Sequence, residues 1–284
     1  MSNLSQLKND TQTILDSLSD LVDAYSDLEW SPSDGFLPIV CRAIIRRQYD
    51  SLESISYLVS SQRGYAAAPM LRPSCEEFIW SKYLLDIPSL DAQQLVTYIA
   101  NDEIYRSLRA QSKAYGKSLS KEHGILPYLE EQKRNRKNLQ HNLRDLGRRL
   151  KWPERSVNNS TTPSMWWLAK QTKEEETYEL IYHATSRFVH FSTSELLRRA
   201  WGNRYGVSVR SVHFGDYWSQ FSLHWGLILF IGSVVEILSA DCLGSEVTLA
   251  VDDEQAISQA AARISKIGKP PIITAEELYW PKQL

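Results

Sequence analysis

The apolar positions of this chain recur every three or four residues through most of its length, which is the period of an α-helix and not that of a β-strand. At the N-terminus they make a narrow stripe with heptad-like spacing, formed by Leu7, Ile14, Leu18, Leu21, Tyr25 and Leu28. Such a stripe is typical of a helix that packs on one partner, either a neighbour in the same chain or another subunit. The pattern therefore predicts a long N-terminal helix, residues 1–30, as a peripheral arm.

Further helical segments follow a break at residues 30–35. The periodicity predicts helices over about 37–62, 69–88 with Pro73 at or near the start, 91–119 with Asp91 as N-cap, 127–150, 165–201 either continuous or with one break, 216–240 and 252–267. The polar stretch 152–164 predicts the clearest loop, and 202–216 fits either a short hairpin or an irregular loop.

The most apolar run of the chain, 225–238, lies inside one of these segments. Because this run is shorter than the roughly 20 residues that cross a bilayer, we expect a central core helix and no membrane association. The expected fold class is all-α, a multi-helix bundle over 36–267 with the arm before it and an extended tail over 268–284.

Composition narrows the function only slightly. The chain has 284 residues and a formal net charge of −2, so binding to a nucleic acid would have to come from a local patch. Cys41, Cys75 and Cys242 are far apart and odd in number, which argues against a disulfide framework or a zinc site. The N-terminus lacks a basic region followed by an apolar block, so we expect a cytoplasmic protein.

One late segment carries the residues best suited to chemistry. Tyr182, Ser186 and His190 are four apart and would share one face of a continuous helix, with Arg187 three residues before His190. A histidine that moves a proton beside an arginine that stabilises a phosphorane suits metal-free cleavage of RNA by its 2′-hydroxyl. The alternative, which base rates favour, is a set of core polar groups satisfied by hydrogen bonds.

A second polar set lies about a hundred residues earlier. Arg72 and Glu76 are four apart among apolar neighbours, so we expect them to face the interior and to pair with each other or with the face of Tyr182. The alternative is a salt bridge on an exposed helix face.

Cofactor and metal motifs are not expected from the sequence. No phosphate-cradling glycine loop occurs, and no Glu-x-x-His pair of the kind that a di-iron bundle needs, so we predict neither a cofactor nor a metal. The basic run over 133–151 fits a phosphate-binding strip or a solvated helix face, and the second reading is the more common for such runs.

Two segments together, "MLRPSCEEFIWSKYLL" and "WWLAKQ" followed by "YELIYHATSRFVHFST", resemble a bacterial family of helical proteins known as domain of unknown function 5677. The resemblance covers about 39–237. It implies an early helix with Arg-x-x-x-Glu and a late helix with Tyr-x-x-x-Ser-x-x-(aromatic or Val)-His, which fall on Arg72, Glu76, Tyr182, Ser186 and His190. The family brings no established reaction with it.

The chain is also similar, more loosely, to HEPN proteins, helical bundles that include ribonucleases of toxin and phage-defence systems. Their signature is an Arg followed four to six residues later by His, usually with a polar residue after the Arg. Here Arg187 and His190 have two residues between them, and Phe188 takes the polar position.

Two functions from different classes follow. In the first, the protein is a stress or phage-defence component that cleaves RNA without a metal, with His190 as general acid or base and Arg72 or Arg187 stabilising the phosphorane. In the second, it is a non-catalytic sensor or interaction module with a structural polar cluster. The expected partners are RNA, and a second copy or another protein at the 7–28 helix.

Overall fold

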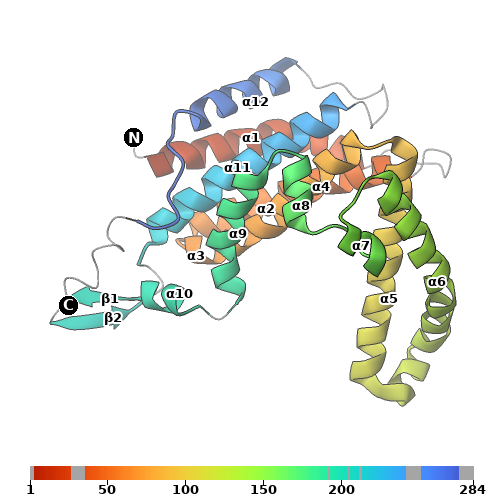
Figure 1. Ribbon diagram of the computed structural model, residues 1–284. Helices are drawn as coiled ribbons and strands as arrows, with labels where there is room; N and C mark the ends of the chain where they lie inside the picture. Colours follow the sequence, from red (N-terminus) through yellow and green to blue (C-terminus); the bar gives the residue numbers. More distant parts are fainter. Residues whose placement is uncertain are drawn as a thin grey trace. The chain divides into compact units, whose positions relative to one another are not determined.

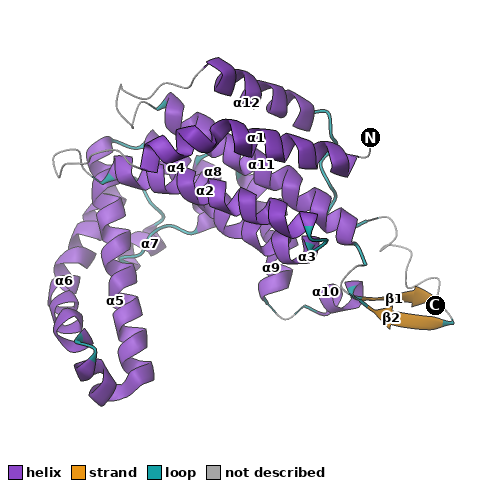
Figure 2. Ribbon diagram, turned by 180° about the vertical axis from the view of Figure 1, so that it is seen from behind, coloured by secondary structure: helices purple, strands orange, loops and turns teal. Residues whose placement is uncertain are grey.

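The structure is a computed structural model that describes residues 3–26, 36–190, 192–203, 205–210, 213–240 and 251–274. Leu28, the predicted break at 30–35 and Cys242 lie outside these ranges. Helices make up most of the described chain, and its strands form one hairpin (Figures 1 and 2), so the predicted all-α class is confirmed.

The chain divides into two compact units, which are described separately. The first consists of Met1–Glu29, Cys41–Lys82 and Ala169–Leu284, and the second of Trp30–Val40 and Tyr83–Leu168.

The first unit is built around α11 (Gly215–Ser239), whose Trp218, Phe221 and Phe230 are fully buried. Its neighbours are α1 (Asn3–Ser26), α3 (Gly64–Ala67), the short 3-10 helix η2 (Ala68–Met70) and α12 (Val251–Ile264). The helices α2 (Leu37–Ser60) and α4 (Leu71–Asp86) approach α11 at its glycines: a Cβ at Gly226 would meet Leu52 at 3.2 Å, and one at Gly232 would meet Phe78 at 3.0 Å.

By length and composition, α11 also qualifies as a membrane span, with a mean hydropathy of 1.8 over its most apolar window. However, 72% of that window is buried inside the protein. Core helices pass the same test of length and composition, and its burial makes α11 the central apolar helix that the sequence predicts.

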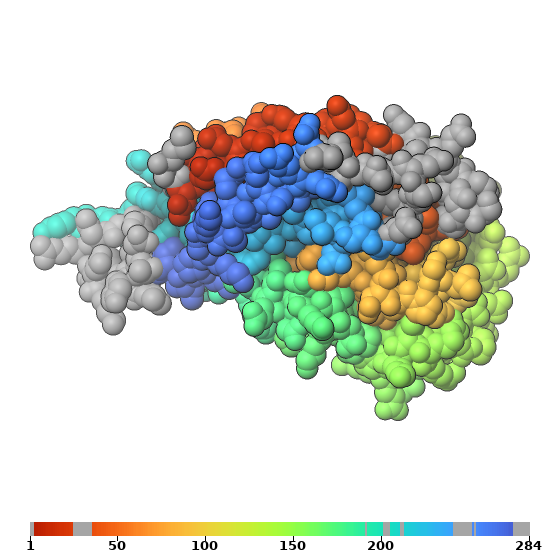
Figure 3. All heavy atoms as spheres, turned by 90° about the horizontal axis from the view of Figure 1, so that it is seen from above, coloured from red at the N-terminus to blue at the C-terminus, as the bar shows by residue number. Residues whose placement is uncertain are grey.

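The first part of the predicted heptad stripe of α1 is buried, with Leu7, Ile14 and Leu18 fully covered and Leu21 half-buried. It packs against both α11 and α12, and the atoms of α12 lie directly along α1 in Figure 3. Asp10 adds an ion pair to this packing, because its carboxylate lies 2.6 Å from Nε of Arg263 of α12. The stripe is therefore covered by two helices of the same chain.

The prediction of helix over 165–201 with at most one break is wrong, because the structure has two breaks there. The structure has α8 (Met165–Gln171), α9 (Glu175–Val189) and α10 (Thr193–Arg198), followed by an antiparallel hairpin of β1 (Ala200–Asn203) and β2 (Gly206–Val209). The break after α9 has a local cause. Ser192 accepts a hydrogen bond from the backbone N–H of Glu195 at 3.4 Å, so a new helix is capped where the old one would have continued.

The second unit contains a long helical hairpin of α5 (Ser89–Glu122) and α6 (Ile125–Arg149), which run side by side in Figures 1 and 2. Leu143 and Leu146 are buried, as the predicted stripe requires. Gly116 interrupts α5 with φ 72° and ψ 176° instead of ending it.

Two further expectations for the second unit are wrong. Pro88 and not Asp91 is the N-cap of α5, because a proline fits just before the first turn, and Asp91 in that turn pairs with Arg149 at 2.7 Å. The predicted loop over 152–164 contains α7 (Glu154–Asn159), and the indole N–H of Trp152 donates to the hydroxyl of Tyr83 at 2.6 Å.

Candidate functional site

The early and late polar motifs meet in the first unit, where α4 faces α9. The guanidinium of Arg72 lies over the ring of Tyr182, with 4.9 Å between its carbon and the ring centroid. The same guanidinium donates from Nε to Oε1 of Glu76 at 3.0 Å. The side chains of Arg72 and Glu76 are 29% and 33% exposed, so the pair is only partly desolvated. We call these residues, with Tyr178, the α4–α9 cluster.

Tyr178 lies one turn before Tyr182, with 5.5 Å between the two ring centroids. Burial raises the pKa of Tyr178, the negative charge of Glu76 raises it further, and Arg72 opposes the shift. Beside it, burial raises the pKa of the Cys75 thiol to about 12. Both groups therefore stay protonated at neutral pH, and Cys75 is not an activated nucleophile.

The other end of α4 is held to α9 by Lys82. Its ammonium lies 2.7 Å from Glu174, the N-cap residue of α9, and 3.3 Å from Glu236 of α11. Burial lowers the pKa of Lys82, but the hydrogen bond and charge of Glu174 outweigh this and raise it overall. Because residue 72 meets 182 and residue 82 meets 174, α4 and α9 are antiparallel and joined at two points.

A second side of α4 binds α2. The side-chain amide of Gln48 donates to the carbonyl of Ser74 at 2.7 Å, and Arg47 lies 2.8 Å from Glu77. Burial raises the pKa of Glu77, although the charge of Arg47 lowers it. The polar residues of α4 thus act as links to the helices on either side.

Of the three residues predicted to share one helix face, Tyr182 and Ser186 lie in α9, whereas His190 is the C-cap immediately beyond it. His190 follows the last residue of α9 with extended backbone angles, φ −118° and ψ 158°, and is exposed. It is eight residues beyond Tyr182, which corresponds to about 12 Å along a helix axis. The structure thus brings together Arg72, Glu76 and Tyr182, but does not bring His190 to them.

Ser186 and Arg187 occupy the last turn of α9 and are half-buried. The carbonyl of Ser186 accepts from the backbone N–H of His190 at 3.0 Å, which closes the helix. Within the described ranges, no hydrogen bond or ion pair engages the side chain of Arg187. Arg187 and His190 therefore remain neighbours at the end of α9.

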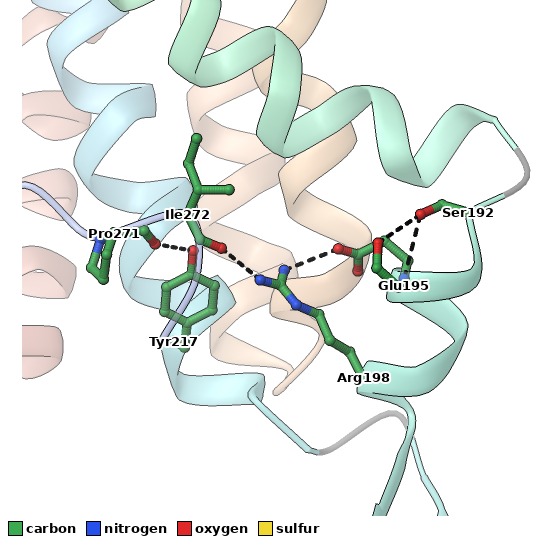
Figure 4. Close-up of polar contacts among 7 residues, drawn as sticks. Ser192, Glu195, Arg198, Tyr217, Pro271 and Ile272 are labelled. Carbon is green, nitrogen blue, oxygen red and sulfur yellow. Dashed lines mark hydrogen bonds and ion pairs between the residues drawn. The ribbon is translucent and has the colours of Figure 1, made fainter. Parts of the chain in front are cut away.

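A buried ionic group that the sequence interpretation missed lies just beyond this point (Figure 4). Arg198 and Glu195 of α10 pair at 3.0 Å with side chains only 3% and 7% exposed, and Arg198 also donates to the carbonyl of Ile272 at 2.5 Å. In the same view, the hydroxyl of Tyr217 donates to the carbonyl of Pro271. The spacing Ser192-x-x-Glu195 is a capping-box signal and could have revealed this short helix.

Aromatic rings surround this ion pair. The guanidinium of Arg198 lies 4.9 Å from the ring of Trp218, which itself contacts Phe188 of α9 at 4.7 Å between centroids. Tyr65 of α3 packs on both rings, and burial together with the charge of Glu195 raises its pKa to about 12. The group fixes α10 against α9, α3 and α11.

One hollow in the first unit lies away from all of the predicted residues. It has a volume of about 600 Å³ and is formed at the start of α11 by residues that include Lys8, Gln62, Asp216 and Ser219. Among the residues whose placement is known, no three His, Cys, Asp or Glu side chains gather closely enough to hold a metal ion.

The fold and the α4–α9 cluster define an all-α protein whose helices are joined by partly buried polar pairs. The chain belongs to the family of unknown function DUF5677, which matches residues 39–205. The match includes the whole α4–α9 cluster and the α5–α6 hairpin but ends before α11. Searches of curated proteins and of solved structures found no significant match, and the comparisons do not show the likeness to HEPN proteins.

Proposed function

We propose that this protein is a cytoplasmic, non-catalytic interaction module in which the α4–α9 cluster is structural. The observation that carries the proposal is the engagement of Arg72 by both Glu76 and Tyr182, while His190 lies beyond the end of α9. Acid–base catalysis needs its groups within hydrogen-bond reach of one reacting atom. The separation of His190 from the cluster favours helix packing as the role of these residues.

An interaction role draws support from the distribution of exposed apolar side chains. The stripe of α1 is buried within the chain, so it is not the surface that we propose for a partner. The α5–α6 hairpin, by contrast, exposes five large apolar or aromatic residues to at least 44%: Leu90, Ile104, Tyr115, Leu119 and Tyr128. Exposed side chains of this kind, when they gather on one element, mark binding surfaces.

A second candidate is favoured by one observation. Arg187 and His190 are adjacent at the end of α9, and His190 is exposed to solvent. In this alternative, the pair cleaves RNA without a metal as part of a stress or phage-defence system, with His190 moving the proton and Arg187 stabilising the phosphorane. Arg72 takes no part, because it is held in the cluster.

The test combines an activity assay with unfolding. The wild type is incubated with labelled RNA in EDTA, and unfolding by urea is followed for Arg72→Met, His190→Ala and the exposed control Arg155→Met. The proposal predicts intact RNA and a loss of about 1–3 kcal/mol for Arg72→Met, because Glu76 and Tyr182 lose their partner. RNA cleavage that His190→Ala and Arg187→Gln abolish at unchanged stability would establish the second candidate instead.

A further inference from the structure

Residues 104–139 of the α5–α6 hairpin, on both sides of its turn, differ in charge from the rest of the chain. We call these residues the arm; the name does not refer to the N-terminal helix. It contains nine Lys or Arg against three Glu, a formal charge of +6. Since the whole chain carries −2, the other residues together carry −8. A near-neutral total therefore conceals a strongly basic element, which supplies the local patch that binding to a polyanion requires.

Most of these cations have no counter-charge. Arg106 pairs with Asp102, Lys133 lies 3.9 Å from Glu130, and Arg136 stacks on Tyr105 at 4.5 Å. The other six are all exposed, and within the described ranges no carboxylate lies within 4.0 Å of them: Arg109, Lys113, Lys117, Lys121, Arg134 and Lys137. Like charges gathered on one hairpin repel each other, and a bound polyanion would remove that repulsion.

Their arrangement along α5 is regular. Arg106, Arg109 and Lys113 are spaced by three and four residues and so share one face of the helix. Lys117 and Lys121 have the same spacing after the interruption at Gly116. The first three cations extend over about 10 Å of helix before the interruption, and the other two continue the series after it.

Aromatic rings accompany the charges at the end of the arm. Tyr128 is 65% exposed and Tyr115 is 46% exposed. Tyr115 also contacts the ring of His123, with 5.8 Å between the centroids, beside the turn at Gly124. Exposed rings next to unpaired cations are what single-stranded nucleic acids bind, because phosphates pair with the cations and unpaired bases stack on the rings.

We infer that the arm binds single-stranded nucleic acid, with the backbone phosphates on its exposed lysines and arginines and the bases on Tyr115 and Tyr128. The inference rests on the proposed function, since it names the partner of the interaction module. A membrane surface is a poorer fit, because membrane-surface helices carry a continuous apolar face opposite their charges. The arm exposes two tyrosines and two aliphatic side chains, Tyr115, Tyr128, Ile104 and Leu119, which are too few for such a continuous face.

Binding is measured on the full chain by the fluorescence anisotropy of labelled single strands of about 20 nucleotides, one of RNA and one of DNA, between 50 and 200 mM salt. With six phosphate contacts, the logarithm of the affinity should fall against the logarithm of salt with a slope of about −4. The triple variant K113Q/K117Q/K121Q should reduce the slope to about −2, because three contacts are lost.

Two controls separate contact from folding. Glutamine has nearly the helix propensity of lysine, so the triple variant should keep its helical content. The matched variant R155Q/K170Q/K266Q removes three exposed cations outside the arm and should bind as the wild type does. Tyr128→Leu should weaken binding about ten-fold by removing a stacking ring, and Tyr128→Phe should restore it.

The inference would be overturned if neither strand binds, if the arm and control variants lose affinity equally, or if duplexes bind as tightly as single strands. It would also be overturned if the arm binds anionic vesicles or a second copy of the chain and does not bind single strands. Cleavage of the bound RNA with arm-dependent affinity would refute the proposed function and leave the inference standing. If the RNA stays intact and does not bind the arm, the inference is refuted and the proposed function stands.

Discussion

Replacing Arg198 with methionine removes a charge from a nearly dry environment. The guanidinium, 3% exposed, pairs with Glu195 at 3.0 Å, donates to the carbonyl of Ile272 at 2.5 Å and lies 4.9 Å from the ring of Trp218. Methionine keeps much of the apolar length of the side chain but none of these interactions. The carboxylate of Glu195 would then lose the guanidinium that neutralises it.

The size of the effect follows from this burial. Breaking a buried ion pair by removing one partner costs about 3–5 kcal/mol, mostly because the remaining charge is uncompensated. An exposed pair would cost less than about 1 kcal/mol. We therefore expect Arg198→Met to lower the free energy of unfolding by about 3–5 kcal/mol. The double variant with Glu195→Gln should recover part of that loss, since the buried negative charge is removed as well.

Urea unfolding followed by the fluorescence of Trp218 and its neighbours measures these values, with circular dichroism as a check that both probes report one transition. A loss below about 1 kcal/mol for Arg198→Met would show that the pair is solvated and would refute the argument. A double variant no more stable than the single one would assign the loss to the carbonyl of Ile272 and the ring of Trp218.

Two more predictions concern the core of the first unit. Burial lowers the pKa of His224 to about 4, so folding favours the neutral ring. The contribution of this ring to the free energy of unfolding is therefore complete above pH 6.5, and about 3 kcal/mol of it is lost as the pH falls to 4. Unfolding measured against pH should show this loss in the wild type and not in His224→Leu. Gly64→Ala should destabilise by about 1–3 kcal/mol, because its Cβ would lie 2.5 Å from the Oγ of Ser219, whereas Gly215→Ala meets nothing within 4 Å and should melt near the wild type.

The periodicity of the sequence was sufficient to predict the helices that bury a regular stripe. Leu7, Ile14 and Leu18 in α1, and the apolar run of α11, are buried as expected because burial is what maintains such a pattern. The pattern could not predict what covers the stripe of α1. A helix that packs on one partner and a helix that packs on two have nearly the same spacing of apolar residues.

Helix ends were predicted less well, because they depend on local competition. Residues 192–195, shortly after Val189, are all polar, and the side chain of Ser192 caps a new helix there. That break leaves His190 as the C-cap of α9 and not inside the helix with Tyr182. The spacing of four residues therefore lies within a helix for Tyr182 and Ser186, and His190 follows as the first residue after it.

The candidate site was predicted in part. The likeness of the Arg72 and Tyr182 motifs to one family suggested that they meet, and the structure places them in contact. The pair of Glu195 and Arg198 escaped notice because a short helix of six residues shows too little periodicity to predict its burial.

The central claim, that the α4–α9 cluster joins two helices and does not include His190, is tested most directly by a double-mutant cycle on unfolding. Arg72→Met, Tyr182→Leu and the combined variant should give a coupling energy of about 1 kcal/mol, since the guanidinium lies over a partly buried ring. The same cycle with Arg72→Met and His190→Ala should give a coupling near zero. A coupling between Arg72 and His190 as large as that with Tyr182, or none with Tyr182, would contradict the account.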